Sequence, residues 1–186
     1  MRPESILIWK VNTNAEKNEA PTLAEAYLLP HMVDELIIVK HNVMTESTKK
    51  SSRMWLIKFA PFRTSWTDIV RRGTFTLRGV RNSQARNYLN DMRVGNQVFF
   101  YHSQQELAIV GIMEVTREAY PDQTSSDPQW LTCDFQPVLT LSKPVTLSEI
   151  REEPTLAKLL LIRQPRLAVM PVTKEESMDI KRLSAK

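Results

Sequence analysis

From Met54 onward, apolar residues recur at spacings that predict a mixture of short strands and short helices. The run Met-Trp-Leu-Ile-Lys-Phe over 54–59 is rich in β-prone residues, and Pro61 follows it, which predicts a strand that ends there. Gly111 interrupts a β-branched run and is the expected site of a bulge. Further extended segments are expected over 74–77, 97–101, 109–117, 130–141 and 166–170.

A helix expected over about 83–93 has the clearest periodicity in the chain. Ala85, Tyr88, Leu89 and Met92 recur at i, i+3, i+4 and i+7, so they share one apolar face. Gly95 supplies the expected exit from this helix. The polar part of its surface carries Asn82, Ser83, Arg86, Asn87, Asn90 and Arg93.

Three further helices are predicted by a hydroxyl residue with an acid three positions later, the arrangement called a capping box. Ser65 with Asp68 opens a helix that runs to Arg72 and stops at Gly73. The segment 155–163 is apolar and helical by propensity. The other two boxes begin at Thr146 and Thr173 and predict helices near 147–152 and 174–183.

Four or five strands with short interspersed helices predict an α+β domain built on a small β-barrel. This domain is expected to cover 53–186. The first 52 residues differ, because they carry only short apolar stretches, and TESTKKSSR at 45–53 has the composition of a polar linker. We expect 1–52 to be a partly disordered extension, with a short helix at 22–29 and a strand at 36–40 as the alternative.

Composition argues for an intracellular protein. The chain has no run of 18 apolar residues that would predict a membrane span, and its N-terminus does not resemble a secretory signal. The single cysteine, Cys133, cannot form an internal disulfide. We therefore expect an intracellular protein with no membrane partner, in the nucleus or cytoplasm if eukaryotic and in the cytoplasm if bacterial. We also expect a monomer.

Arginine is concentrated in one part of the chain. Residues 63–93 hold seven arginines and only two acids, Asp68 and Asp91. Such a local excess of positive charge indicates a phosphate-bearing partner, although a solvated basic surface is the alternative interpretation. The seven are Arg63, Arg71, Arg72, Arg78, Arg81, Arg86 and Arg93.

Motifs of the common enzyme classes are lacking. The chain's four glycines form neither a phosphate loop nor a dinucleotide fingerprint, and no G-x-S-x-G elbow occurs. His102 and Ser103 are adjacent on a predicted strand, so they point to opposite faces and are poorly placed as base and nucleophile. Three scattered histidines and one cysteine give no metal-ligand spacing. We expect no catalytic residues, no metal and no cofactor, and interpret Cys133 as a small core residue.

Six sequence blocks occur here in the order found in one known family. They are MWLIK at 54–58, GVRNSQARN at 79–87, FFYHS at 99–103, IVGIMEV at 109–115, REAYPD at 117–122 and RQPRLAVMPVT at 163–173. Over about 54–183 the chain resembles the EVE domain family, which is similar to PUA, ASCH and YTH domains. The resemblance implies a PUA-like small mixed β-barrel with short surrounding helices and a pocket for a nucleobase, in particular a modified one.

The chain departs from the family pattern at several positions. Leu77-Arg78 stands where the family has Trp followed by an acid, and Ser83 stands where it has Tyr. Lys58-Phe-Ala-Pro61 lacks the acid expected before the proline, and the loop around 122–129 is shorter. Loss of aromatic stacking surface costs about 1–3 kcal/mol per base in aromatic platforms. The pocket is expected to persist in outline, with its ligand preference left open.

Polar residues at the start of the 83–93 helix are the first candidates for a site, because amides both donate and accept hydrogen bonds and arginine offers a planar fork. Alternatives stay open at this point: Asn82 can cap the helix, Arg81 can tie loops together through carbonyls, and Trp55 can belong to the core. The candidate nucleobase and nucleic-acid contacts are Trp55, Lys58, Arg81, Asn82, Ser83, Gln84, Arg86, Asn87, Tyr101, His102, Ser103, Arg163, Gln164 and Arg166.

The sequence thus predicts a non-enzymatic reader that holds a flipped or unpaired nucleobase, modified or not, in DNA or RNA. A nucleotide-acting or nucleoside-acting enzyme with Lys58, His102 or Arg86 as acid–base groups is one alternative. A protein-interaction module with a decayed pocket is the other.

Overall fold

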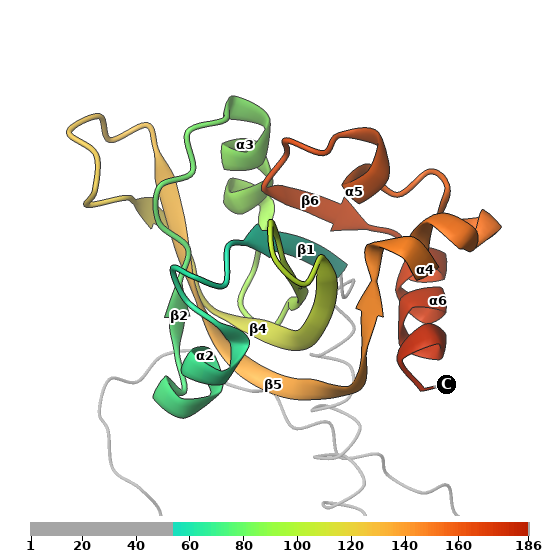
Figure 1. The fold of residues 1–186 in the computed structure, drawn as a ribbon. Coiled ribbons are helices and arrows are strands. Elements are labelled where there is room, and N and C mark those ends of the chain that lie inside the picture. Colours follow the sequence, from blue (N-terminus) through green and yellow to red (C-terminus); the bar gives the residue numbers. More distant parts are fainter. Residues whose placement is uncertain (1–53, 186) are drawn as a thin grey trace, which may run out of the picture. The chain divides into compact units, whose positions relative to one another are not determined.

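A single curved mixed sheet, with short helices around it, organises the part of the chain that this computed structural model describes, residues 54–185 (Figure 1). Its elements in chain order are β1 (Met54–Phe59), α2 (Trp66–Arg72), β2 (Phe75–Thr76), α3 (Ser83–Asp91), β3 (Gln97–His102), β4 (Ala108–Pro121), β5 (Leu131–Thr146), α4 (Leu147–Glu152), the 3-10 turn η1 (Pro154–Leu156), α5 (Leu160–Arg163), β6 (Val169–Val172) and α6 (Lys174–Ser184).

The strands pair in the order β2-β5-β4-β3-β1-β6. β1 runs parallel to β3, while the other neighbouring pairs are antiparallel, and β4 and β5 form a long hairpin. The sheet curves strongly, but its two edge strands, β2 and β6, are not paired with each other. The expected α+β class is confirmed, and the barrel is an open one.

Local sequence determines most helix ends. Ser65 and Asp68 form the expected capping box of α2, and Gly73 ends this helix in the left-handed region at φ 70°. α4 and α6 begin with the two other predicted boxes, at Thr146 and Thr173. Asn82 caps α3, because its side-chain oxygen accepts the backbone N–H of Ala85.

Two expectations near the C-terminal end were wrong in detail. The segment 155–163 is not one helix, because Leu159 has extended backbone (φ −54°, ψ 130°) between η1 and α5. The last strand begins at Val169 rather than at 166, because Leu167 donates its N–H to the Gln164 carbonyl in a turn. The two hairpin strands are also longer than predicted, since β4 runs to Pro121 and β5 to Thr146.

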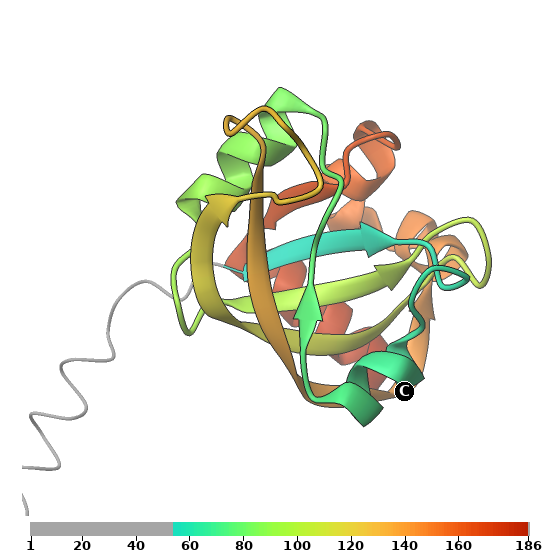
Figure 2. The same ribbon diagram turned by 90° about the vertical axis from the view of Figure 1, so that its left-hand side faces the viewer.

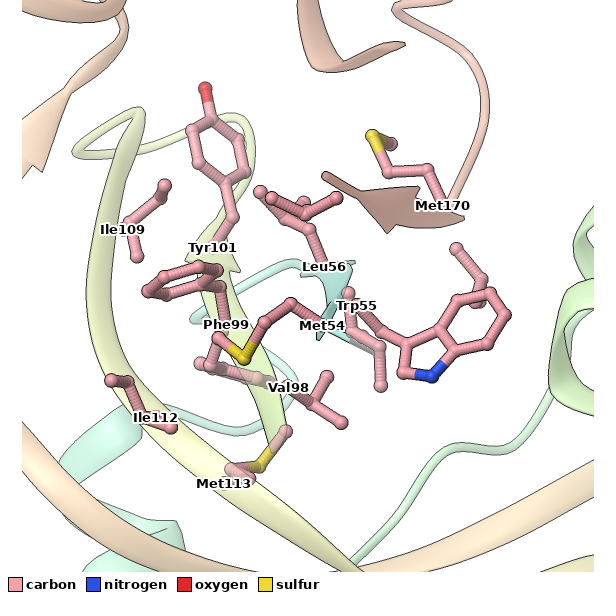
Figure 3. Packing of buried hydrophobic residues seen from close by; sticks show 14 of the residues in the cluster. Met54, Trp55, Leu56, Val98, Phe99, Tyr101, Ile109, Ile112, Met113 and Met170 are labelled. Carbon is pink, nitrogen blue, oxygen red and sulfur yellow. The ribbon is translucent and has the colours of Figure 1, made fainter. Parts of the chain in front are cut away.

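The core lies inside the curved sheet and between the sheet and its helices. Figure 3 shows part of it, with side chains from several strands packed together. All four residues of the predicted apolar face of α3 pack there, with Tyr88 only partly buried. Trp55 is 2% exposed and donates its indole N–H to Asn96 at 3.1 Å. Figure 3 shows Tyr101 at the edge of the cluster, with its hydroxyl directed away from Phe99.

The predicted bulge occurs next to Gly111. The pairing register of β4 shifts there against both neighbours, between Phe100 and Tyr101 on β3 and between Ile109 and Gly111 on β4 itself. Trp66, the first residue of α2, packs its indole directly over Gly111. The glycine thus lets a helix approach the sheet closely.

The expected extension, with its candidate helix at 22–29 and strand at 36–40, lies outside the described residues. Within 54–185, no helix is long and apolar enough to cross a membrane.

Candidate functional site

A hollow of about 380 Å³ opens where four segments distant in sequence meet. Residues of 58–63, 77–82, 103–104 and 166–168 line it, and we call it the central hollow. Turned by 90°, Figure 2 shows the segment from α2 through β2 to α3 crossing in front of β1 and β3. The hollow is therefore bounded by this crossing segment and by the loops that follow β1 and β3.

Positive charge surrounds the central hollow. Of the side chains in the described part of the chain that line it, five are cationic and none is acidic. A site of this volume is near the lower end of the roughly 300–1,000 Å³ that small-molecule pockets span, which suits one nucleoside-sized group. The five cations are Lys58, Arg63, Arg78, Arg81 and Arg166.

A second hollow of about 470 Å³ adjoins the first on the side of α5, and we call it the α5 hollow. The two share Lys58, Ser103 and Arg166 in their walls. Tyr101 lines only the α5 hollow, and burial raises the pKa of its hydroxyl. Six of the predicted site residues are thus brought together by these two hollows: Lys58, Arg81, Asn82, Tyr101, Ser103 and Arg166.

Arg81 is held in place by a buried acid. Its guanidinium donates to Asp122 at 2.8 Å, to Thr124 at 3.1 Å and to the Val80 carbonyl at 3.0 Å. The Asp122 side chain is completely buried and also accepts the backbone N–H of Gly79 at 2.9 Å. Burial alone would raise the pKa of Asp122, but the hydrogen bonds from Arg81, Gly79 and Thr124 outweigh it and hold that pKa well below its usual range.

The contacts of Asp122 with Arg81 and Gly79 fix the backbone that borders the central hollow. Asp122 holds the start of the 79–82 segment, and Asn82 holds its end through the cap of α3. Because the cap uses the Asn82 oxygen, the amide nitrogen remains available as a donor, and the residue lines the central hollow. Asn82 therefore combines the capping role with a placement suited to ligand contact.

Lys58 closes the opposite side. Its ammonium group donates to the carbonyl of Pro165, which ties the end of β1 to the turn before β6. Burial lowers the pKa of Lys58. Since the side chain lines both hollows, it serves as a positively charged partition between them.

The remaining predicted residues lie elsewhere. Trp55 is a core residue, so it cannot stack on a ligand in either hollow. Arg86 donates to Asn87 and Gln129, and Gln84 donates to the Tyr88 hydroxyl. Ser83, Gln84, Arg86, Asn87, His102, Arg163 and Gln164 line neither hollow.

His102 acts as a structural bridge. It is 4% exposed, its Nε2 accepts the backbone N–H of Trp66 at 3.1 Å, and its Nδ1 lies 2.6 Å from the Glu106 carboxylate. The imidazole therefore joins the start of α2 to the loop after β3. That loop contains three residues in the left-handed region, Gln104, Glu106 and Leu107, and it carries Ser103 to the hollow.

We expect Glu106→Ala to lower the free energy of unfolding by about 1 kcal/mol, because it removes a charge-assisted hydrogen bond whose acceptor is largely exposed. Denaturant titration measures this change. Gln105→Ala is the matched control, since that neighbour is exposed and makes no side-chain hydrogen bond within the described part of the chain. An equal loss in both variants would contradict the bridging role of His102.

Several residues of the central hollow were not predicted from the sequence. Phe62 stands at its edge with 66% of its surface exposed, and Arg63 lies over the Phe59 ring at 5.4 Å. Arg78 and Gln104 are the other polar residues of this hollow that were not among the candidates. Arg63 and Arg78 belong to the arginine cluster noted in the sequence, and Asp122 ends one of the family blocks, so those signals could have found them.

The described residues outside the hollows that could react or bind a metal do not form a catalytic or metal site. Cys133 is buried, and burial together with the nearby Asp134 and Glu118 raises the pKa of its thiol to about 12. Among residues 54–185, no group of three or more His, Cys, Asp or Glu side chains could hold a metal ion. The three acid–base candidates also do not converge, since only Lys58 lines a hollow, while His102 is buried and Arg86 lies beside Gln129.

The family model described as EVE domain matches residues 53–183. The chain belongs to the EVE domain family. Thymocyte nuclear protein 1 of chicken is 38% identical, in a match covering 53% of this chain and 50% of that protein. The human protein of the same name is 34% identical, over 53% of this chain and 54% of its own length. The chain thus spans about half the length of these relatives.

Solved structures share the EVE fold. A crystal structure of an Agrobacterium tumefaciens protein is 38% identical, with a TM-score of 0.70, covering 71% of this chain and 92% of that one. Human thymocyte nuclear protein 1, in complex with DNA containing 5-methylcytosine, is 30% identical, with a TM-score of 0.67, covering 73% of this chain and 99% of that one. The expected PUA-like fold class is confirmed.

Proposed function

We propose that this EVE domain is a non-enzymatic nucleic-acid-binding module that holds one flipped or unpaired nucleobase, preferably a modified one, in the central hollow. The observation that carries the proposal is the convergence of four distant segments on one nucleoside-sized, positively charged cavity. The human relative's complex with DNA containing 5-methylcytosine supports the same ligand class.

The groups around the hollow suit a base attached to a backbone. The Asn82 amide and the Ser103 hydroxyl supply neutral hydrogen-bonding groups for the edge of a base. Phe62 offers an exposed aromatic ring at the mouth, and Lys58, Arg78 and Arg166 offer charge for phosphate. A protein acting in this way as a monomer belongs where nucleic acid is present, in the nucleus or the cytoplasm.

Phe62→Ala is expected to weaken binding of a single-stranded oligonucleotide by about 1–3 kcal/mol, roughly 5- to 150-fold, because it removes the stacking ring. Fluorescence anisotropy at low salt, where phosphate contacts are strongest, measures the affinity for oligonucleotides with and without a modified cytosine. Met178→Ala is the matched control, because Met178 is similarly exposed (61%) and lines neither hollow.

Absence of binding by the unaltered protein at low salt would overturn the reader hypothesis and favour a protein-interaction module. Conversion of a nucleotide or nucleoside to product would favour the enzyme alternative instead. Binding that is equal for all bases and insensitive to Phe62→Ala would show that the central hollow does not receive the base.

A further inference from the structure

Two more hollows extend the central one along the crossing segment. The first, of about 330 Å³, lies beside α2 and includes Arg63, Arg72 and Thr74 in its wall, and we call it the α2 hollow. The second, of about 400 Å³, includes Arg117, Tyr120 and Asp134, and we call it the β4 hollow.

Shared wall residues show that these hollows adjoin one another. Phe59, Arg63 and Arg78 line both the central hollow and the α2 hollow. Thr74, Thr76 and Arg78 line both the α2 hollow and the β4 hollow. Arg78 lines all three, so the central, α2 and β4 hollows form a row across β2 to the end of β4, and we call this row the groove.

The alternation of residues along β2 produces this surface. Phe75 and Leu77 point into the core, with 6% and 2% of their surfaces exposed. Thr74, Thr76 and Arg78 lie at i, i+2 and i+4 and therefore face outward. Phe75 packs edge-on against Phe59 at 5.1 Å and Phe100 at 5.4 Å, so the floor of the groove is anchored in the aromatic core.

Charge along the groove is almost entirely positive. Among the described residues, the α2 hollow and the β4 hollow together are lined by four arginines, Arg63, Arg72, Arg78 and Arg117, and by one acid, Asp134. One oxygen of Asp134, Oδ1, accepts hydrogen bonds from Thr76 at 2.6 Å and from Tyr120 at 2.9 Å, so this acid is partly occupied within the protein.

The four arginines are available for a ligand. Within residues 54–185, no carboxylate lies within 4.0 Å of the side-chain nitrogens of any of them. Other arginines of the domain differ: Arg71, next to Arg72, is paired with Asp68 at 2.5 Å. Arg117 is held over the Tyr120 ring at 3.8 Å, which orients its guanidinium at the wall of the groove.

We propose that this groove binds the sugar–phosphate backbone of the nucleic-acid strand next to the nucleotide in the central hollow, with Arg63, Arg78, Arg72 and Arg117 contacting successive phosphates. The inference rests on the proposed function, since the strand enters the groove from the base site. The groove is open and polar, with threonine hydroxyls between the arginines, so it contacts the backbone and contributes affinity without reading the base sequence.

The test is the salt dependence of oligonucleotide affinity. Each phosphate contact on a single strand contributes about 0.7 to the slope of log K against log salt concentration. Arg72→Gln/Arg117→Gln in the full chain is expected to lower that slope by about 1.4 and to weaken binding equally for modified and unmodified bases. Lys158→Gln/Lys174→Gln is the charge-matched control, since both lysines are exposed and line none of the four hollows.

The proposed role of the groove would be overturned if the arginine variant had the same salt slope as the unaltered protein, or if the lysine control changed the slope equally. A mononucleotide carrying the same base provides a second arm, because it lacks the neighbouring backbone. Its affinity is expected to be unaffected by the arginine substitutions, and an equal loss for mononucleotide and oligonucleotide would also contradict the groove.

An oligonucleotide with one abasic position separates this inference from the proposed function. If the groove binds the backbone but the central hollow does not receive a base, the abasic strand binds as tightly as the intact one, and the arginine variant still has a lower salt slope. If the groove is wrong but the base site is right, base discrimination and the Phe62→Ala loss persist while the slope does not respond.

Discussion

Asp122→Ala is expected to lower the free energy of unfolding by about 3 kcal/mol. The substitution leaves the Gly79 N–H without its acceptor and Arg81 without its charged partner. Breaking a buried ion pair costs roughly 3–5 kcal/mol, and we take the lower end because 36% of the Arg81 side chain is exposed. Urea unfolding monitored by tryptophan fluorescence measures the change.

The same variant is expected to lose oligonucleotide affinity, because the 79–82 segment, which includes Arg81, forms one wall of the central hollow. Asp127→Ala is the matched control: Asp127 lies in the same loop, and within residues 54–185 its side chain accepts hydrogen bonds only from the nearby Gln129. We expect its cost to stay below about 1 kcal/mol. Equal losses in the two variants would show that Asp122 does not anchor the site.

Acid titration should reveal the same carboxylate. The pKa of Asp122 is lower in the folded protein than the ordinary value of about 3.9. A depressed pKa means that the unfolded state binds protons first, so the stabilisation is present above about pH 4 and is lost as pH falls toward the folded pKa. Stability of the unaltered protein should therefore fall more steeply below pH 4 than that of Asp122→Ala.

Local features of this domain were predictable because the residues that cause them are neighbours in sequence. The capping box of Ser65 and Asp68, the apolar face of α3 and the bulge at Gly111 each depend on a few consecutive positions. The segment 155–163 shows the limit of such reasoning. Its apolar residues favour a helix by propensity, but the chain buries them in the core with two short helical segments, η1 and α5, on either side of Leu159.

The candidate site was only half predictable, because a polar helix face does not distinguish solvent from ligand. Arg81 and Asn82 reach the central hollow because they precede α3, whereas Arg86 and Asn87 lie further along it and line neither that hollow nor the α5 hollow. Pairs far apart in sequence were missed for a different reason. Arg81 and Asp122 are 41 positions apart, and nothing local indicates their contact.

Gly111→Ala is expected to destabilise the domain by about 3 kcal/mol or more, the upper part of the range for overpacking a core. An added Cβ would lie 2.1 Å from Cζ2 and 2.4 Å from Cε2 of the Trp66 indole, far inside van der Waals contact. The indole cannot retreat easily, because its N–H donates to Thr140 at 2.9 Å and its ring packs against Phe100 at 5.7 Å.

A double-mutant cycle decides whether Trp66 is the cause. A Trp66→Ala background removes the three atoms nearest to the added methyl group, so Gly111→Ala should there cost less than about 1 kcal/mol. A similar cost in both backgrounds would assign the effect to the strand itself. The same helix, α2, carries Arg72, which lines the groove. Displacement of α2 by Gly111→Ala should therefore also lower the salt slope of oligonucleotide binding. Such a result would link the packing of this glycine to the surface proposed to hold the strand.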